Sequence, residues 1–130
     1  MTGQSPLFLS VELVLQAHTE MICAYGGSDG IRDRGLIESA VAQGRNAYYY
    51  GHADVFGIAA AYAFHLAESQ AFIDGNKRTG AVAALAFLHL NGTDIARIDS
   101  QDVYEMMIRV ATKALSKKGL ADFLRNRIAP

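Results

Sequence analysis

The sequence is poor in residues that interrupt or cross-link a chain. It contains two prolines, Pro6 and Pro130, both near an end, no tryptophan and one cysteine. An interior without proline favours uninterrupted helices. A single cysteine excludes an internal disulfide. Because Cys23 lies between apolar neighbours, we expect it to be a reduced thiol in the protein core.

The sequence also lacks an excess of one charge. With 12 basic and 13 acidic residues the net charge is −1, which gives no general reason to expect binding to nucleic acid or to a membrane surface. Residues 101–130 carry 6 basic and 3 acidic side chains, a pattern typical of a solvated helix face. No apolar run is long enough to span a bilayer, and the first residues do not resemble a signal peptide. We therefore expect a cytoplasmic protein.

The remaining composition predicts one compact, all-α domain over residues 1–130. Hydrophobic residues make up 51% of the chain and charged residues 19%. Side chains suited to capping a helix N-terminus are Ser10, Asp54, Asp99 or Ser100, and Ser116. The expected helices cover about residues 11–25, 35–42, 55–69, 76–90, 100–115 and 117–127. Residues 26–34 are predicted as a loop, and residues 43–54 as a loop or a short pair of strands.

Two segments are apolar almost throughout. They run from Gly57 to Ala67 and from Ala81 to Leu90. A helix that is apolar on all sides is buried on all sides. We therefore predict a helical bundle around a central, buried helix hairpin, whose connection contains the stretch QAFIDG.

The segment QAFIDGNKRTG, residues 70–80, has the features of a phosphate-binding helix start. A helix N-terminus presents unpaired N–H groups and a positive dipole, and Gly75 permits close backbone approach. Lys77 and Arg78 add positive charge where the dipole disfavours it, unless an anion binds. Asp74 is a possible Mg²⁺ ligand, and Asn76 can bind a phosphate oxygen.

Each of these residues also has a simpler interpretation. Asp74 can cap the helix, Lys77 and Arg78 can be solvated, Asn76 can fix the turn, and Phe72 is expected in the core. The segment is not a Walker A loop, because G-x-x-x-x-G-K-[ST] is absent. The combination D-G-N-K-R-T between two buried helices is harder to explain by structure alone than any one of its residues.

The segment resembles the signature of the Fic/Doc family, H-x-F-x-[D/A]-[A/G]-N-[K/R]-R. Lysine after the asparagine, followed by Arg-Thr, is similar to the death-on-curing (Doc) branch. GIRDRGLIESAV, QGRNAYYYG and FLHLNG are similar as well, so that the resemblance extends over about residues 10–127.

The resemblance implies an all-α fold and transfer of part of a nucleoside triphosphate to a protein hydroxyl. Typical members transfer AMP, whereas the Doc branch contains toxins that phosphorylate elongation factor Tu and are paired with the antitoxin Phd. The cofactors would be ATP and Mg²⁺. The protein would contact nucleic acid only indirectly, through an antitoxin. By position, Asp74 would bind Mg²⁺. The phosphates would be held by Gly75, Asn76, Lys77 and Arg78. A flap that docks the target would contain Asn46, Tyr48, Tyr49 and Tyr50.

The chain departs from the signature at its first residue. The family has its catalytic base, a histidine, where this sequence has Gln70. A glutamine amide can orient a hydroxyl but cannot accept its proton. General base catalysis is worth about 10²- to 10⁴-fold, so activity should be reduced or lost. Replacement of the base by His65 or Glu68 is a minor alternative, since a helix would place His65 on another face.

Other side chains allow two interpretations. Arg32 and Arg34 can pair with Asp29 and Asp33 or lie near the phosphates. The three tyrosines can pack on the bundle instead of contacting a target, and Met106 and Met107 suit the core or a groove. The remaining histidines, His18, His52 and His89, suggest no cluster.

Two functions follow from these observations. The first is a Doc-like toxin that transfers phosphate or AMP from ATP, with Gln70 limiting the reaction. The second is a catalytically silent module with the same fold that binds nucleotide or antitoxin. Nucleic-acid binding through the C-terminal helices is a weaker third possibility, because the net charge is balanced.

Overall fold

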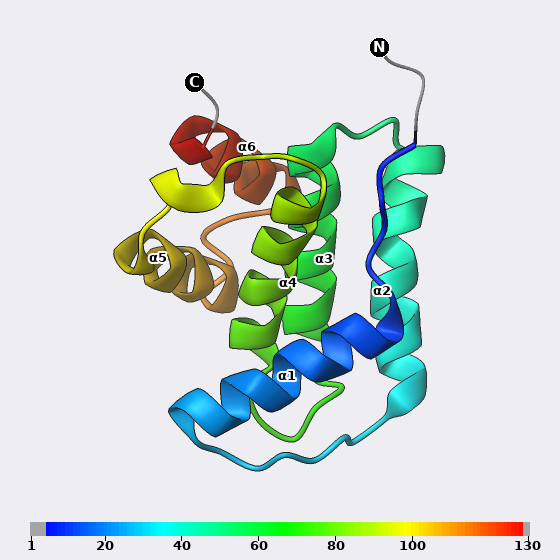
Figure 1. Ribbon diagram of the computed structural model, residues 1–130, viewed down its shortest axis with the longest axis vertical. Helices are drawn as coiled ribbons and strands as arrows, with labels where there is room; N and C mark the ends of the chain where they lie inside the picture. The colour runs from blue at the N-terminus through cyan, green and yellow to red at the C-terminus, as the bar shows by residue number, and fades with distance from the viewer. Residues whose placement is uncertain (1–4, 129–130) are drawn as a thin grey trace.

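A computed structural model describes residues 5–128, and within this range the fold is all-α, as predicted (Figure 1). The helices are α1 (Val11–Tyr25), α2 (Arg34–Tyr49), α3 (Val55–Ser69), α4 (Asn76–Leu90), a short 3-10 helix η1 (Ile95–Arg97), α5 (Ser100–Ala111) and α6 (Lys117–Ile128). Strand-like pairing in this range is limited to one isolated antiparallel bridge, between Ile31 and Phe72. None of the described helices is both long and apolar enough to cross a membrane.

The predicted central hairpin is confirmed by α3 and α4. The two helices run antiparallel through the middle of the bundle, with α2 and α6 against α3 and with α1 and α5 against α4 (Figure 1). Small residues let them approach closely: a Cβ atom placed on Gly80 would lie 2.6 Å from the carbonyl oxygen of Ala63. The preceding residue of α4, Thr79, is fully buried, and its hydroxyl has no hydrogen-bond partner among the described residues.

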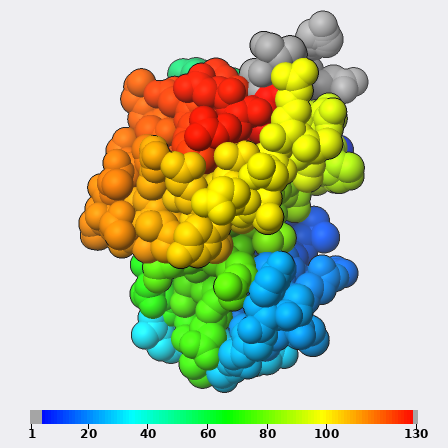
Figure 2. Space-filling view, turned by 90° about the vertical axis from the view of Figure 1, so that its left-hand side faces the viewer, coloured from blue at the N-terminus to red at the C-terminus, as the bar shows by residue number. Residues whose placement is uncertain are grey.

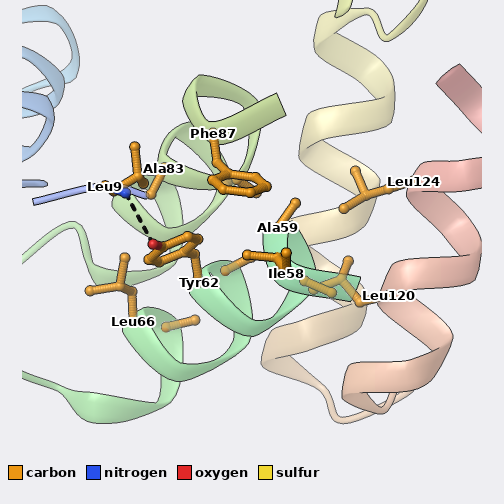
Figure 3. Close-up of a cluster of buried hydrophobic side chains, with 14 of the residues drawn as sticks. Leu9, Ile58, Ala59, Tyr62, Leu66, Ala83, Phe87, Leu120 and Leu124 are labelled. Carbon is orange, nitrogen blue, oxygen red and sulfur yellow. Dashed lines mark hydrogen bonds between the residues drawn. The ribbon is translucent and has the colours of Figure 1, made fainter. Parts of the chain in front are cut away.

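Large side chains fill the space on either side of this hairpin (Figure 3). Tyr62 of α3 is buried against Phe87 of α4, with ring centroids 5.4 Å apart. Its hydroxyl accepts a hydrogen bond from the N–H of Leu9, 3.0 Å away, which fastens the segment before α1 to the core. On the opposite side Leu120 and Leu124 of α6 are fully buried.

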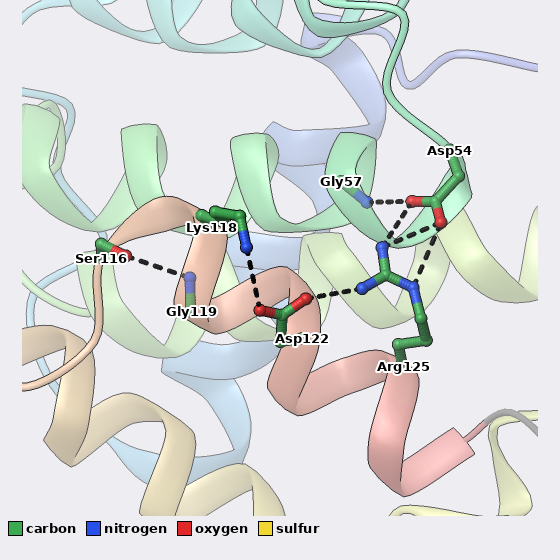
Figure 4. A network of polar contacts seen from close by, with 7 residues as sticks. All are labelled: Asp54, Gly57, Ser116, Lys118, Gly119, Asp122 and Arg125. Carbon is green, nitrogen blue, oxygen red and sulfur yellow. Dashed lines mark hydrogen bonds and ion pairs between the residues drawn. The ribbon is translucent and has the colours of Figure 1, made fainter.

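Four of the predicted caps are confirmed. The side chains of Ser10, Asp54, Asp99 and Ser116 accept hydrogen bonds from backbone N–H groups in the first turns of α1, α3, α5 and α6. Asp54 has a second partner, because Arg125 of α6 donates to both of its carboxylate oxygens (Figure 4). Partial burial raises the pKa of Asp54, but hydrogen bonds from the Gly57 N–H and from Arg125 outweigh burial and hold this pKa below its ordinary value.

The prediction of a loop or strand pair after residue 42 is wrong. Helix α2 continues to Tyr49. Gly44 suggested a helix end, but it is buried, and a Cβ atom there would overlap the ring of Tyr62. This glycine therefore serves close packing rather than a turn. Tyr48 follows it on the helix and packs edge-on against Phe8, with ring centroids 5.8 Å apart.

Cys23 is exposed, which contradicts the expected buried thiol. It lies in the last turn of α1, where Met21 and Ile22 are half-buried and Cys23, Ala24 and Tyr25 face solvent. Apolar neighbours in the sequence were therefore a poor guide to its burial.

Candidate functional site

The loop between α3 and α4, residues 70–75, borders a cavity of about 470 Å³ whose other wall is α5. In the view of Figure 2, α5 lies above this loop and above the end of α1. The residues that line the cavity are Gln70, Ile73, Asp74, Gly75, Asn76, Lys77, Arg78, Tyr104, Met107 and Ile108. Six of the sequence-predicted site residues, from Gln70 to Arg78, are thus brought together at one opening.

The N-terminus of α4 lies at this cavity without a side-chain cap. The N-cap residue is Gly75, whose φ of 81° is in the left-handed region that glycine adopts easily. The first turn closes with the Thr79 N–H on the Gly75 carbonyl, 2.9 Å, which leaves the earlier N–H groups without helical partners. Lys77 and Arg78 are exposed in this turn. Backbone donors, the helix dipole and two cations together make an anion-binding site.

The side chain of Arg78 also contacts α1. Its guanidinium lies over the ring of Tyr25 at the end of α1, 4.5 Å from the ring centroid. A cation over an aromatic face is stabilised by about 0.5–1 kcal/mol at an exposed site. This contact limits the orientations of Arg78 at the mouth of the cavity.

Asn76 shapes the loop rather than reaching into the cavity. It is buried, its side-chain oxygen accepts from the Phe72 N–H at 3.0 Å, and its side-chain nitrogen donates to the Phe72 carbonyl at 2.9 Å. Both ends of the amide are therefore used within the loop. Of the two interpretations of Asn76, the structure favours the one that fixes the turn, while its backbone N–H remains at the helix start. Phe72 is buried, as predicted.

Asp74 does not cap α4, because the N-cap is Gly75. Its carboxylate Oδ2 instead accepts a hydrogen bond from the Ser28 N–H, 2.8 Å away. Asp74 is exposed at the cavity. The described residues contain no group of three His, Cys, Asp or Glu side chains able to hold a metal ion. One carboxylate next to a phosphate site fits Mg²⁺, which binds proteins through one or two carboxylates together with phosphate oxygens.

Gln70 ends α3 with a left-handed backbone, φ 55° and ψ 31°. It is exposed and lines the cavity. Its side-chain nitrogen lies 3.5 Å from the Ala67 carbonyl, and the backbone carbonyl of Gln70 accepts a hydrogen bond from the Arg32 guanidinium. Gln70 thus places an amide at the cavity, at the position where the signature described above has a histidine.

Neither His65 nor Glu68 lines the cavity. The Nε2 atom of His65 accepts a hydrogen bond from Lys117 at 2.9 Å. Burial first, and then the charge of Lys117, lower the pKa of His65 below its ordinary value. Glu68 pairs with Lys113 at 3.8 Å. Both side chains are engaged elsewhere on the bundle.

The loop is braced by the segment before α2. The Arg32 and Asp33 N–H groups donate to the Ala71 carbonyl at 2.8 and 3.1 Å, and the Ile73 N–H donates to the Gly30 carbonyl at 3.0 Å. Arg32 contacts the Gln70 carbonyl rather than Asp29 or Asp33.

Arg34 is also paired differently from the prediction. It lies 3.5 Å from both Glu12 and Glu38, on the outer side of α2. The expected pairing of these arginines with Asp29 and Asp33 is therefore wrong.

The residues assigned to a docking flap lie elsewhere. Asn46, Tyr48 and Tyr49 are in the last turn of α2, and Tyr50 is its C-cap. Helix α2 starts beside the loop at residues 70–75, and a rise of about 1.5 Å per residue puts these four residues roughly 18–24 Å further along it. The structure does not bring them to the cavity. The segment beside the loop is instead Gly30–Asp33.

The α5 wall of the cavity was predicted only in part, since a groove was one of two interpretations of Met107. Tyr104, Met107 and Ile108 lie at i, i+3 and i+4, a spacing that places them on one face of α5. Met106, next to them, is in the core. The available signal was a second apolar stripe on this helix beside the one that packs on α4. His18 was missed as well: it is buried beneath the loop, and its role is considered below.

Comparison with known proteins agrees with this geometry. Residues 8–88 match the model of the Fic/DOC family, a range that contains α1 to α3, the loop and most of α4. The chain is 32% identical over 118 residues to "Protein kinase doc" of Escherichia phage P1, covering 90% of this chain and 92% of the relative. It is 40% identical over 94 residues to "Toxin Doc" of Mycolicibacterium smegmatis, covering 69% of this chain and 72% of the relative. The protein therefore belongs to the Fic/DOC family.

Proposed function

We propose that this protein is a Doc-like toxin that transfers a phosphate group, or AMP, from ATP to a hydroxyl of a target protein. The observation that carries the proposal is the cavity at the uncapped start of α4, where Lys77 and Arg78 lie beside a carboxylate. Free N–H groups and cations suit the phosphates of a nucleotide. The relatives named as a protein kinase and as a toxin support the same function.

The residues take distinct parts in this proposal. The first-turn N–H groups of α4, Lys77 and Arg78 bind and orient the phosphates, while Asn76 holds the loop in shape. Asp74 would hold Mg²⁺, which supplies charge neutralisation at the phosphates. Gln70 accepts a hydrogen bond from the attacking hydroxyl and orients it without removing its proton.

The reaction should be slow but not abolished. Phosphoryl transfer passes through a loose transition state, so that positioning and charge stabilisation supply most of the catalysis. The missing base costs about 10²- to 10⁴-fold. His65 and Glu68 are engaged by Lys117 and Lys113, so neither is available to replace it.

The finer assignments rest on the relatives. A relative named as a protein kinase favours phosphate over AMP. Elongation factor Tu is the target implied by the Doc branch, and a Phd-like antitoxin is the implied partner. The experiment below tests the first two assignments, the transferred group and the target.

A silent binding module is the second candidate function. The observation that favours it is Gln70 itself, since neither a histidine nor a glutamate lines the cavity. In that case the protein would bind nucleotide or antitoxin without transferring any group.

Restoring the base distinguishes the two functions. The protein and its Gln70→His variant are incubated with ATP, Mg²⁺ and a bacterial lysate or purified elongation factor Tu, and intact-protein mass spectrometry measures any added mass. The Gln70→His variant is expected to modify a target about 10²- to 10⁴-fold faster. A phosphate-sized addition identifies a kinase, and an AMP-sized addition identifies a nucleotidyltransferase.

Gln101→His, at an exposed position in the first turn of α5, is the matched control and should not raise the rate. Because residue 70 already has a left-handed backbone with a side chain, histidine adds no new backbone strain there. If Gln70→His binds ATP and modifies nothing, the transferase function is refuted and the binding module remains.

A further inference from the structure

A buried imidazole lies directly under the loop at residues 70–75. His18 of α1 is only 2% exposed. Its ring stacks on the buried ring of Phe72, with centroids 3.8 Å apart and planes 10° apart. Burial of a polar ring is unfavourable unless its nitrogens find partners. Both nitrogens of this ring face groups that belong to, or adjoin, the loop.

The closest partner is the backbone carbonyl of Asp74, 2.8 Å from Nε2 of His18. Since a carbonyl oxygen only accepts, Nε2 must carry a proton and donate it. On the other side of the ring, Nδ1 lies 3.5 Å from the carboxylate of Asp29. His18 thus joins α1 to the loop and to the segment that precedes α2.

This hydrogen bond determines the orientation of one peptide group. The peptide between Asp74 and Gly75 is planar and trans, so a carbonyl directed at His18 sends the Gly75 N–H to the opposite side. Gly75 lines the cavity and can adopt either orientation of this peptide at little cost, because it has no Cβ. Without a fixed hydrogen-bond donor on the inner side, nothing in the glycine itself would select one orientation.

The same peptide carries the Asp74 side chain. Its carboxylate accepts the Ser28 N–H at 2.8 Å, so the backbone and the side chain of Asp74 are held from two directions. A Cβ atom on Gly27, next to Ser28, would lie 3.3 Å from the Cβ of Asp74, which shows how closely the two segments pack.

We propose that His18 is a positioning residue: by donating to the Asp74 carbonyl it fixes the Asp74–Gly75 peptide, and with it the Asp74 carboxylate and the Gly75 N–H at the cavity. The inference deepens the proposed function, on which it rests for the identity of the ligand. His18 does not touch the nucleotide. It sets the geometry of the Gly75 N–H, which would meet the phosphates, and of the Asp74 carboxylate, which would hold Mg²⁺.

Three variants separate the hydrogen bond from packing. His18→Phe keeps a flat ring against Phe72 and removes the donor. His18→Gln places an amide N–H near the position of Nε2 and so can rescue it. His52→Asn, at an exposed position at the other end of α2, is the matched control.

The measurements are the amide resonances of Ser28 and Gly75 in the free protein, and the dissociation constant of ATP with Mg²⁺ and with EDTA. In His18→Phe both resonances should move, and ATP should bind at least about 5-fold more weakly in each condition, as expected for a lost hydrogen bond. His18→Gln should return both quantities toward those of the unsubstituted protein. His52→Asn should change neither.

Two results would overturn the inference. One is a folded His18→Phe variant with unchanged resonances and affinity, and the other is a His18→Gln variant that behaves like His18→Phe. If His18→Phe does not fold, the ¹⁵N spectrum of the unsubstituted protein decides, because an Nε2 without a proton is incompatible with the proposed bond. The amide resonances are measured in the free protein, so they do not depend on whether the protein transfers a group. A failure of the proposed function can therefore be told apart from a failure of this inference.

Discussion

Replacement of Gly80 by alanine tests whether the close approach of α3 and α4 stabilises the fold. The new Cβ atom would lie 2.6 Å from the Ala63 carbonyl oxygen and 3.3 Å from the Ala67 nitrogen. Ordinary contacts begin near 3.4 Å, so the helices would have to separate by roughly 0.8 Å. Because both opposing atoms are backbone atoms of a buried helix, no side chain can rotate to relieve the overlap.

The magnitude follows from two opposing effects. Alanine is favoured over glycine in a helix by about 1 kcal/mol. Overpacking of a well-packed core costs about 1–3 kcal/mol, and a rigid backbone contact is expected at the upper end. The free energy of unfolding should therefore fall by about 2 kcal/mol, which corresponds to a melting temperature lower by about 5–10 °C.

Urea denaturation and thermal unfolding measure both quantities. The control is Gly119→Ala in the first turn of α6, where the nearest atom is the mobile tip of Leu115 at 3.1 Å. This variant should be neutral or more stable by up to about 1 kcal/mol. Equal stability of the two variants would refute the argument that the close approach of α3 and α4 limits residue 80.

Three further predictions concern single polar groups. Thr79→Val removes a buried hydroxyl without a partner among the described residues and should raise the free energy of unfolding by about 1 kcal/mol in urea denaturation; a loss would mean that the hydroxyl has a partner. Tyr62→Phe leaves the Leu9 N–H without its acceptor and should cost about 1–3 kcal/mol by the same measurement, whereas no loss would show that water replaces the bond. Asp54→Asn breaks the ion pair with Arg125 and should cost about 0.5–1 kcal/mol at pH 7. The folded-state pKa of Asp54 lies below its ordinary 3.8, so this stabilisation is present above pH 3.8 and is lost as the pH falls through the folded-state pKa. The stabilities of the two proteins should therefore converge in acid. A difference in stability that stays constant with pH would contradict the pairing.

The fold was largely predictable because its signals are local. Caps at Ser10, Asp54 and Asp99 act within one helical turn, and the two apolar segments are buried whatever surrounds them. The end of α2 was not predictable by the same means. A buried glycine and a glycine at a helix end have the same local sequence signal, and only the ring of Tyr62 above Gly44 distinguishes them.

The site was predictable where it is contiguous in the sequence. The stretch from Gln70 to Arg78 forms one side of the cavity, and its residues meet there because they are neighbours in the sequence. The other side depends on which face of α5 turns toward the loop, and this is decided by packing of the whole bundle. The Ser28 N–H on Asp74 is equally non-local, since it joins residues 46 positions apart.

The hydrogen bond between His18 and the Asp74 carbonyl spans 56 positions of the sequence. A signature written over residues 70–80 contains the groups proposed to meet a ligand, but it omits the residue proposed to orient them. Two chains with the same signature can therefore differ in competence through a substitution at position 18 alone. When such chains are sorted into active and inactive members, the column of an alignment that holds residue 18 belongs beside the signature.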